Sequence, residues 1–148
     1  MATRIAARPG NAALVFLSSQ DASLKAYEVV RHEQKGLPVV SIRLPKLEHA
    51  EQTYFNSKIK SLFRDLLDAY RPDVVHLHSV QGLGASLAEA CIEAKIPYVI
   101  TLHDAWWLCE RQFMVKPDHH YCGQSTIDMK VCETCVRNIG WTEMRFRY

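Results

Sequence analysis

The chain has 148 residues, of which 48% are hydrophobic and 23% are charged, and its formal net charge is +2. These values are typical of a globular protein that is long enough to bury a core. Basic residues are interleaved with acidic ones, which argues against a nucleic-acid-binding protein. No apolar run is long enough to span a bilayer, and the run at residues 12–17 is too short for a secretory signal, so we expect a cytoplasmic protein.

The first third of the chain predicts strands. Residues 12–18, AALVFLS, form a short apolar run with β-forming side chains, which is typical of a buried strand. Residues 27–32 and 37–44 flank a turn that contains Gly36, and they predict an antiparallel pair. A helix that begins after Asp21 is the alternative for the start of this region.

The middle of the chain alternates helices and strands. Residues 54–70 carry apolar side chains at helical spacing. Residues 73–79 then predict a strand, residues 83–95 a helix, and residues 96–102 a strand that is nearly all apolar, as in a parallel sheet covered on both faces. This order predicts an α/β fold, namely a Rossmann-like parallel sheet flanked by helices with right-handed crossovers.

Regular periodicity is absent at both ends of the sequence. Residues 1–11 predict a disordered tail or an expression remnant. Residues 12–148 are expected to form one Rossmann-like domain, of which residues 105–148 form an irregular flap that contains cysteines. There is no dinucleotide fingerprint, because Leu87 stands where its third glycine would be, and there is no phosphate loop or serine-hydrolase elbow.

Polar side chains stand where two of the predicted strands end. His76 and His78 alternate along one strand, so they share a face, and His78 lies at its carboxyl end. His103 and Asp104 end the next strand in the sequence. Ligands of open α/β sheets bind outside the carboxyl ends of the strands, so we expect His78 and His103 to open into one crevice. For His76, a hydrogen-bonded position in the core is the favoured interpretation.

Four cysteines follow that strand end with the spacing C-x12-C-x9-C-x2-C. Zinc favours four thiolates in a tetrahedron, and a C-x-x-C pair supplies two of them from one tight turn. A long loop without periodicity also needs a source of order other than a hydrophobic core. We therefore expect a structural zinc ion held by Cys109, Cys122, Cys132 and Cys135.

Other interpretations of the cysteine cluster stay open. An iron–sulfur cluster also takes four cysteines, and His119 or His120 is a substitute for one thiolate. Four reduced, partly buried thiols in an ordinary loop are the simplest alternative. Cys91 lies on the apolar face of a predicted helix and is expected to serve packing.

The segment from Arg71 to Cys109 resembles the acceptor-side domain of the family-four glycosyltransferases, which have the GT-B fold. It reads RPDVVHLHSVQGLGASLAEACIEAKIPYVITLHDAWWLC, whereas the family typically reads RPDVVHxHxxxxLSxxxLxAAKxxGIPVVxTxHDxW. The hairpin and the helix before Arg71 also fit the family's order, so the resemblance covers residues 12–135. A subset of the family is similar further, with a cysteine after the tryptophan and later cysteines that end in C-x-x-C.

The resemblance implies the transfer of a sugar from a nucleotide-sugar donor to an acceptor hydroxyl, with retention of configuration. His103 would correspond to the family's strand-end histidine, which faces the donor sugar, and would be the catalytic residue. His78, Asp104 and Trp106 would bind substrate. For Trp106 and Trp107, the alternative is that both close the core beneath the loop.

The same resemblance implies that the chain is half of an enzyme. The family's opening strand and the nucleotide-binding partner domain have no counterpart here, so we expect the chain to need a donor-binding domain or subunit and to be inactive alone. The alternative is a non-catalytic, metal-stabilised binding or assembly module that pairs with a separate donor-domain subunit. An open sheet edge would favour a homo-oligomer, and the mildly basic surface suits peripheral contact with the inner membrane surface.

Overall fold

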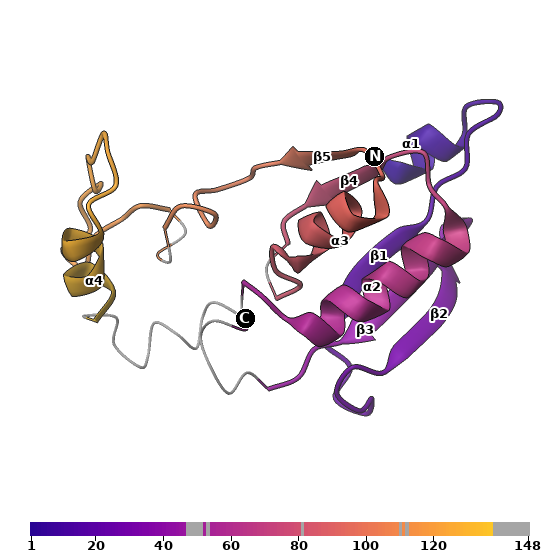
Figure 1. The fold of residues 1–148 in the computed structure, drawn as a ribbon, viewed down its shortest axis with the longest axis horizontal. Coiled ribbons are helices and arrows are strands. Elements are labelled where there is room, and N and C mark those ends of the chain that lie inside the picture. The colour runs from indigo at the N-terminus through magenta and orange to yellow at the C-terminus, as the bar shows by residue number, and fades with distance from the viewer. Residues whose placement is uncertain (47–51, 53, 81, 110, 112, 138–148) are drawn as a thin grey trace. The chain divides into compact units, whose positions relative to one another are not determined.

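A computed structural model describes residues 1–46, 52, 54–80, 82–109, 111 and 113–137 of the chain. We expected one domain over residues 12–148, whereas the contacts divide the chain into two compact units, Met1–Thr101 and Leu102–Tyr148. Figure 1 labels the helices and strands in chain order. The first unit begins with the short helix α1 (Ala2–Ala6), which lies in the segment expected as a tail and buries no residue.

The first sheet of the first unit has three strands, in the order β1-β3-β2. They are β1 (Val15–Ser19), β2 (Val29–Gln34) and β3 (Leu37–Arg43). β1 pairs with β3 in parallel, and β2 pairs with β3 as an antiparallel hairpin. Lys35 and Gly36 at the hairpin turn have φ angles of 52° and 74°, which is the left-handed pair that a two-residue hairpin requires. The predicted hairpin is therefore confirmed, and the alternative helix is not formed.

Helix α2 (Ser57–Tyr70) begins and ends at clear local signals. Asn56 precedes it in an extended conformation, and its side-chain oxygen accepts hydrogen bonds from the backbone nitrogens of Lys58 and Ile59, both at 3.2 Å. This is the arrangement of an N-cap. At the other end Arg71 adopts the left-handed conformation that commonly terminates a helix.

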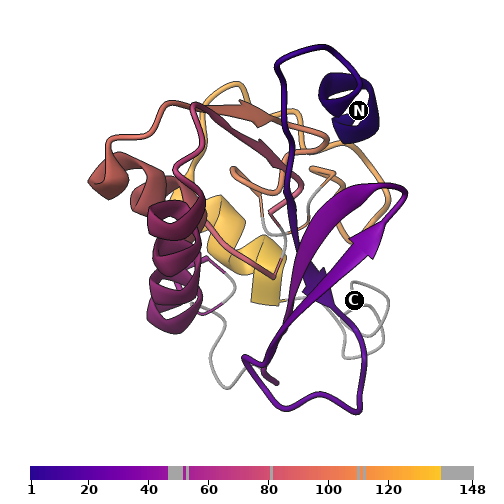
Figure 2. The same ribbon diagram turned by 90° about the vertical axis from the view of Figure 1, so that its right-hand side faces the viewer.

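The apolar face of α2 lies on the first sheet. The rings of Phe16 on β1 and Phe63 on α2 have centroids 5.1 Å apart. Figure 2 shows the twisted hairpin of β2 and β3. The buried side chains of the helix follow the predicted helical spacing: Ile59, Phe63, Leu66 and Leu67.

The second sheet is a parallel pair of β4 (Val75–His78) and β5 (Tyr98–Thr101), joined by α3 (Ser86–Ala94). Cys91 of α3 has no exposed surface, which confirms the prediction that it serves packing. Together, the parallel pairs and the helices confirm the predicted α/β, Rossmann-like class, here with its strands in one three-stranded and one two-stranded sheet.

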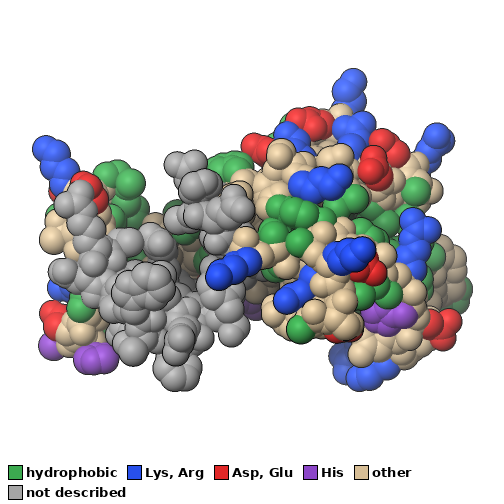
Figure 3. Space-filling view, turned by 90° about the horizontal axis from the view of Figure 1, so that it is seen from below, with side chains coloured by type: hydrophobic (Ala, Val, Ile, Leu, Met, Phe, Trp, Pro, Cys, Tyr) green, Lys and Arg blue, Asp and Glu red, His purple; other side chains and the backbone are tan. Residues whose placement is uncertain are grey.

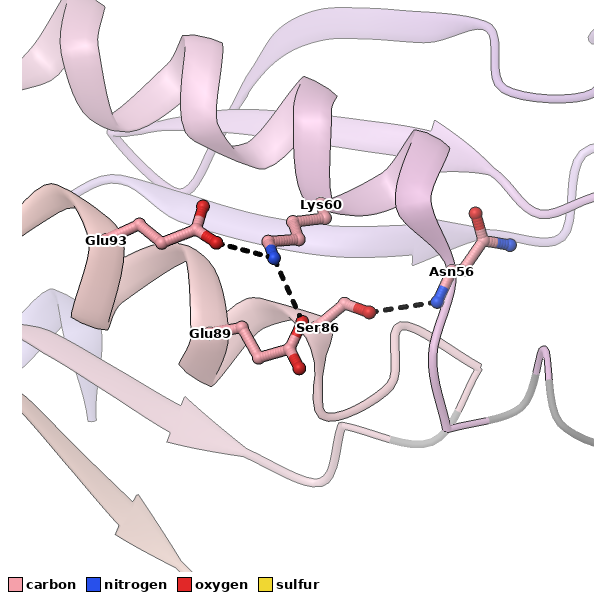
Figure 4. Close-up of polar contacts among 5 residues, drawn as sticks. All are labelled: Asn56, Lys60, Ser86, Glu89 and Glu93. Atoms are coloured by element: carbon pink, nitrogen blue, oxygen red, sulfur yellow. Dashed lines mark hydrogen bonds and ion pairs between the residues drawn. The ribbon is translucent and has the colours of Figure 1, made fainter.

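Helices α2 and α3 pack side by side through polar contacts at their edges, as Figure 4 shows. The Lys60 ammonium lies 3.1 Å from a carboxylate oxygen of Glu89 and 2.7 Å from one of Glu93. At the amino-terminal ends of the helices, the backbone nitrogen of Asn56 donates a hydrogen bond to the buried Ser86 hydroxyl at 2.9 Å. These contacts join the helix that follows β3 to the helix that follows β4.

In the described part of the second unit, residues 102–109, 111 and 113–128 form no helix or strand apart from a bridge between Val115 and Tyr121, and helix α4 (Met129–Arg137) follows. Asp128 starts this helix, because its carboxylate accepts a hydrogen bond from the Lys130 nitrogen at 2.9 Å. The C-x-x-C pair lies on α4, so the tight turn expected for these two cysteines is not what the structure has.

Charged side chains of both signs lie beside one another on the face shown in Figure 3. This agrees with the interleaving of charges in the sequence. Among the residues that the structure describes, no helix is long and apolar enough to cross a membrane.

Candidate functional site

Three polar side chains gather at the carboxyl ends of β4 and β5. His78 and Thr101 are register partners and are the last residues of the two strands. The His76 Nε2 atom lies 2.7 Å from the Thr101 hydroxyl oxygen, and the rings of His76 and His78 have centroids 3.9 Å apart. The structure thus forms one cluster of two imidazoles and a hydroxyl, on one face of the strand pair.

The structure corrects the expectation that His76 is a core residue. Its side chain makes the hydrogen bond that the interpretation required, but the residue is exposed. The reason is the alternation along β4: Leu77 is buried, and its neighbours His76 and His78 therefore point to the other, exposed face.

In the second unit, His103 and Asp104 follow the end of β5 after one residue, Leu102, whereas the sequence predicted a strand that reaches Leu102. His103 is exposed and Asp104 is half-buried. The Asp104 carboxylate accepts a hydrogen bond from the Trp106 backbone nitrogen at 2.8 Å, which closes a turn of the kind that Asp commonly makes. This turn holds the start of the loop after the strand.

Trp106 is the main apolar side chain buried in the described part of this loop. Only 7% of its surface is exposed, and its ring meets that of Trp107 edge-on with centroids 5.3 Å apart. So little free surface leaves no ring face on which a sugar can stack. The geometry of Trp106 therefore matches the interpretation in which the tryptophans close the core beneath the loop.

The predicted crevice involves both units. His78 belongs to the first unit, whereas His103 belongs to the second. That these two histidines share a crevice therefore stays a prediction.

The four cysteines of the second unit are all half-buried free thiols. Two of them approach the same side chain: the Gln124 Nε2 atom lies 3.2 Å from the Cys122 sulfur and 3.7 Å from the Cys132 sulfur. Hydrogen bonds from the side chain and then the backbone of Gln124 lower the pKa of the Cys122 thiol, and the charge of Lys116 acts in the same direction. No pattern in the sequence indicated the role of Gln124.

Cys109 and Cys135 are held in other ways. The Cys109 backbone nitrogen donates to the Ala105 carbonyl at 2.7 Å. The carbonyl oxygen of Cys135 accepts from the guanidinium of the buried Arg111, at 3.4 Å from Nε and 3.3 Å from Nη2. These contacts use the backbone of each cysteine rather than its sulfur.

This arrangement does not fit the predicted metal site. Within the described residues, which include all four cysteines, no group of three or more His, Cys, Asp or Glu side chains could hold a metal ion. His119 and His120, the possible substitutes, are exposed in a turn beside Asp118. The zinc prediction, and the iron–sulfur alternative with it, therefore has no support from the structure.

A further polar cluster lies at the carboxyl ends of β1 and β3, which sequence reasoning did not single out. The Arg43 guanidinium donates to the Ser19 carbonyl at 3.4 Å, and Asp21 accepts from the Ser23 hydroxyl at 2.7 Å and the Ser23 nitrogen at 2.9 Å. These hydrogen bonds, and more weakly the charge of Arg43, lower the pKa of the Asp21 carboxyl group. The sequence indicated that Arg43 lies near the end of a predicted strand, but only the structure shows that this strand pairs in parallel with β1.

Comparison with known protein families gives one match. The family model described as "Glycosyl transferase 4-like domain" matches residues 2–121, which include both strand ends with His78 and His103. No curated protein and no solved structure gives a significant match. Since the family match spans well over half of the sequence, the chain belongs to the glycosyl transferase 4-like domain family.

Proposed function

We propose that the chain is the acceptor-side domain of a glycosyltransferase, which transfers a sugar from a nucleotide-sugar donor to an acceptor hydroxyl with retention of configuration. The observation that carries this proposal is the polar edge of the β4–β5 pair. His78 and Thr101 end the two strands at the same level, and His103 and Asp104 follow Thr101 in the sequence after Leu102. In parallel sheets this edge is where ligands bind.

Each histidine at this edge has a distinct proposed role. His103 is the catalytic residue, and its imidazole hydrogen-bonds a hydroxyl of the donor sugar and orients the anomeric carbon. His78 binds the acceptor, supported by the tilted ring of His76 beside it, which Thr101 holds by a hydrogen bond of 2.7 Å. The transition state is oxocarbenium-like, so positioning and charge stabilisation supply most of the acceleration. No step of this proposal passes through a metal ion.

The leaving nucleotide phosphate needs positive groups that stabilise its developing charge. The strand-end cluster of His76, His78 and Thr101 contains no lysine or arginine. We therefore propose that a donor-binding domain of roughly similar size completes the site, and that the complete enzyme works in the cytoplasm.

An activity assay with matched histidine variants tests this proposal. The chain is assayed alone and with a donor-binding domain of the same family fused to it, and transfer is measured as release of the nucleotide diphosphate. The chain alone is expected to show no turnover, and in the fusion His103→Ala is expected to lower kcat by roughly 100-fold, because positioning is lost.

His119→Ala is the control, because His119 is an exposed histidine of the same unit that does not follow a strand of the sheet in the sequence. It is expected to leave kcat unchanged. Turnover of a nucleotide sugar by the isolated chain, or equal losses in the two variants, would contradict the proposal.

Open strand edges favour a second candidate function, a binding or assembly module. Within the described residues β1 pairs only with β3, and β4 pairs only with β5. β1 reads VFLSS, without the charges or proline that keep natural edge strands unpaired, whereas the outer strand β2 carries Arg31 and Glu33. The contrast suggests that the free edge of β1 is normally covered.

Light scattering on the purified chain distinguishes this second function. A module with an uncovered β1 edge is expected to self-associate, and Leu17→Lys, which puts a charge on β1, is expected to shift the chain towards the monomer. A monomer at all concentrations would count against the assembly module, and it would leave the transferase proposal untouched.

A further inference from the structure

The side-chain amide of Gln124 connects two cysteines to the start of helix α4. Its nitrogen lies 3.2 Å from the Cys122 sulfur and 3.7 Å from the Cys132 sulfur. Its oxygen accepts a hydrogen bond from the Asp128 backbone nitrogen at 2.8 Å. Because both sulfur atoms contact one nitrogen atom, they are close neighbours, although nine residues separate them in the sequence.

Of the five cysteines, Cys122 and Cys132 are the two whose sulfur atoms contact the Gln124 amide. Cys91 is fully buried in the first unit. The described contacts of Cys109 and Cys135 are made by their backbone atoms, with Ala105 and Arg111. Cys122 and Cys132 are half-buried, so a small reagent has access to them, and the same amide holds both sulfurs. Two adjacent, accessible thiols are the arrangement that forms a disulfide.

We propose that Cys122 and Cys132 are a covalent modification site, at which a low-molecular-weight disulfide oxidises the pair to an intramolecular disulfide. This inference concerns the second unit and does not depend on the proposed sugar transfer. It takes the place of the four-thiolate metal site, which the arrangement of the cysteines does not fit.

The reaction is a double thiol–disulfide exchange. With glutathione disulfide as the oxidant, the Cys122 thiolate attacks one of its sulfur atoms, forms a mixed disulfide and releases one glutathione thiolate. The Cys132 thiolate then attacks the Cys122 sulfur and releases the second glutathione. The cysteine pair loses two electrons and two protons, and glutathione disulfide gains both as two molecules of glutathione.

Formation of this bond has a structural consequence. A disulfide joins the two sulfur atoms at about 2.05 Å and removes the thiol and thiolate groups, so the hydrogen bonds that the Gln124 amide donates to these sulfurs become weaker. Its oxygen also holds the Asp128 nitrogen, and Asp128 in turn caps the first turn of α4. Oxidation is therefore expected to loosen the amino-terminal turn of α4 and to speed hydrogen exchange there.

Redox titration of the full chain tests the proposal. The reduced protein is equilibrated with mixtures of glutathione and glutathione disulfide, quenched with acid, alkylated and digested, and the disulfide-linked peptides are identified by mass spectrometry. We expect a single internal disulfide that joins Cys122 to Cys132, with Cys91 alkylated only after unfolding. Cys132→Ser is expected to stop the reaction at a glutathione adduct on Cys122.

Cys109→Ser and Cys135→Ser are the matched controls, since both remove a half-buried thiol of the same unit. In both variants the Cys122–Cys132 disulfide is expected to form at the same glutathione ratio as in the wild type. A different pairing, or no internal disulfide when glutathione disulfide is in large excess, would overturn the proposal. Protection of all four thiols from alkylation by one equivalent of added zinc would also overturn it, and would restore the metal site.

Discussion

The two units of the chain are stabilised in different ways. The first unit buries apolar side chains from both sheets and from helices α2 and α3, and Ile42, Ile59 and Cys91 have no significant exposure. In the described part of the second unit, only Trp106 and Arg111 are buried. Its structure depends instead on side-chain hydrogen bonds such as those of Asp104, Gln124 and Asp128.

This difference in stabilisation indicates which unit suits a rigid polar cluster and which suits a reversible reaction of thiols. Burial of apolar surface contributes about 25 cal/mol per Å², which sums over a core, whereas a hydrogen bond contributes roughly 0.5–1.5 kcal/mol net. The first unit therefore provides a rigid edge for the histidine cluster. The second unit opens more easily, since its stability rests on few local contacts. A reversible thiol pair suits such a unit.

Ile59→Ala is expected to have the largest effect, because it removes a fully buried side chain from the core of the first unit. The cavity is expected to lower the free energy of unfolding by roughly 2–5 kcal/mol, measured by urea unfolding with circular dichroism. Ile92→Ala is the control, since Ile92 on α3 is 61% exposed, and it is expected to change that free energy by less than about 0.5 kcal/mol. Similar losses in the two variants would show that burial does not stabilise the first unit.

Asn56→Ala is expected to have the second largest effect. The substitution leaves the backbone nitrogens of Lys58 and Ile59 without their cap, and loss of an N-cap costs about 1–2 kcal/mol. The same urea titration measures it. Asn11→Ala, at an exposed position outside any helix, is expected to have no measurable effect. If Asn56→Ala is equally neutral, the cap does not contribute to the stability of α2.

Asp128→Ala is expected to have the smallest and most local effect. Without the carboxylate, the Lys130 nitrogen loses its partner, and exchange of the amide hydrogens in α4 is expected to be roughly five-fold faster. Hydrogen exchange by mass spectrometry measures it, and the unfolding of the first unit is expected to stay unchanged. Asp118→Ala, which removes the cap of a turn in the same unit, is the control and should leave α4 unchanged. If Asp128→Ala also lowered the free energy of unfolding of the first unit, the two units would not be independent in stability.

Much of the first unit could be predicted from the sequence, because its signals are local. The turn at Lys35-Gly36, the periodic apolar residues of α2 and the alternation along β4 each act within a few residues. Helix α4 was not predicted, because its sequence, MKVCETCVR, contains a C-x-x-C pair that indicated a metal-binding turn. Its start signal, Asp128, was present in the sequence and is the cap in the structure.

The sequence by itself determined the α/β class and the positions of His78, His103 and Asp104 at or shortly after strand ends, since these follow from chain order and side-chain period, and its resemblance to the family-four glycosyltransferases indicated the family. Only the tertiary structure decided that His76 is exposed and held by Thr101, and that Gln124 brings Cys122 and Cys132 together. The physical reason is that these contacts join residues from separate segments. Which segments meet depends on the packing of whole elements, and no local pattern records it.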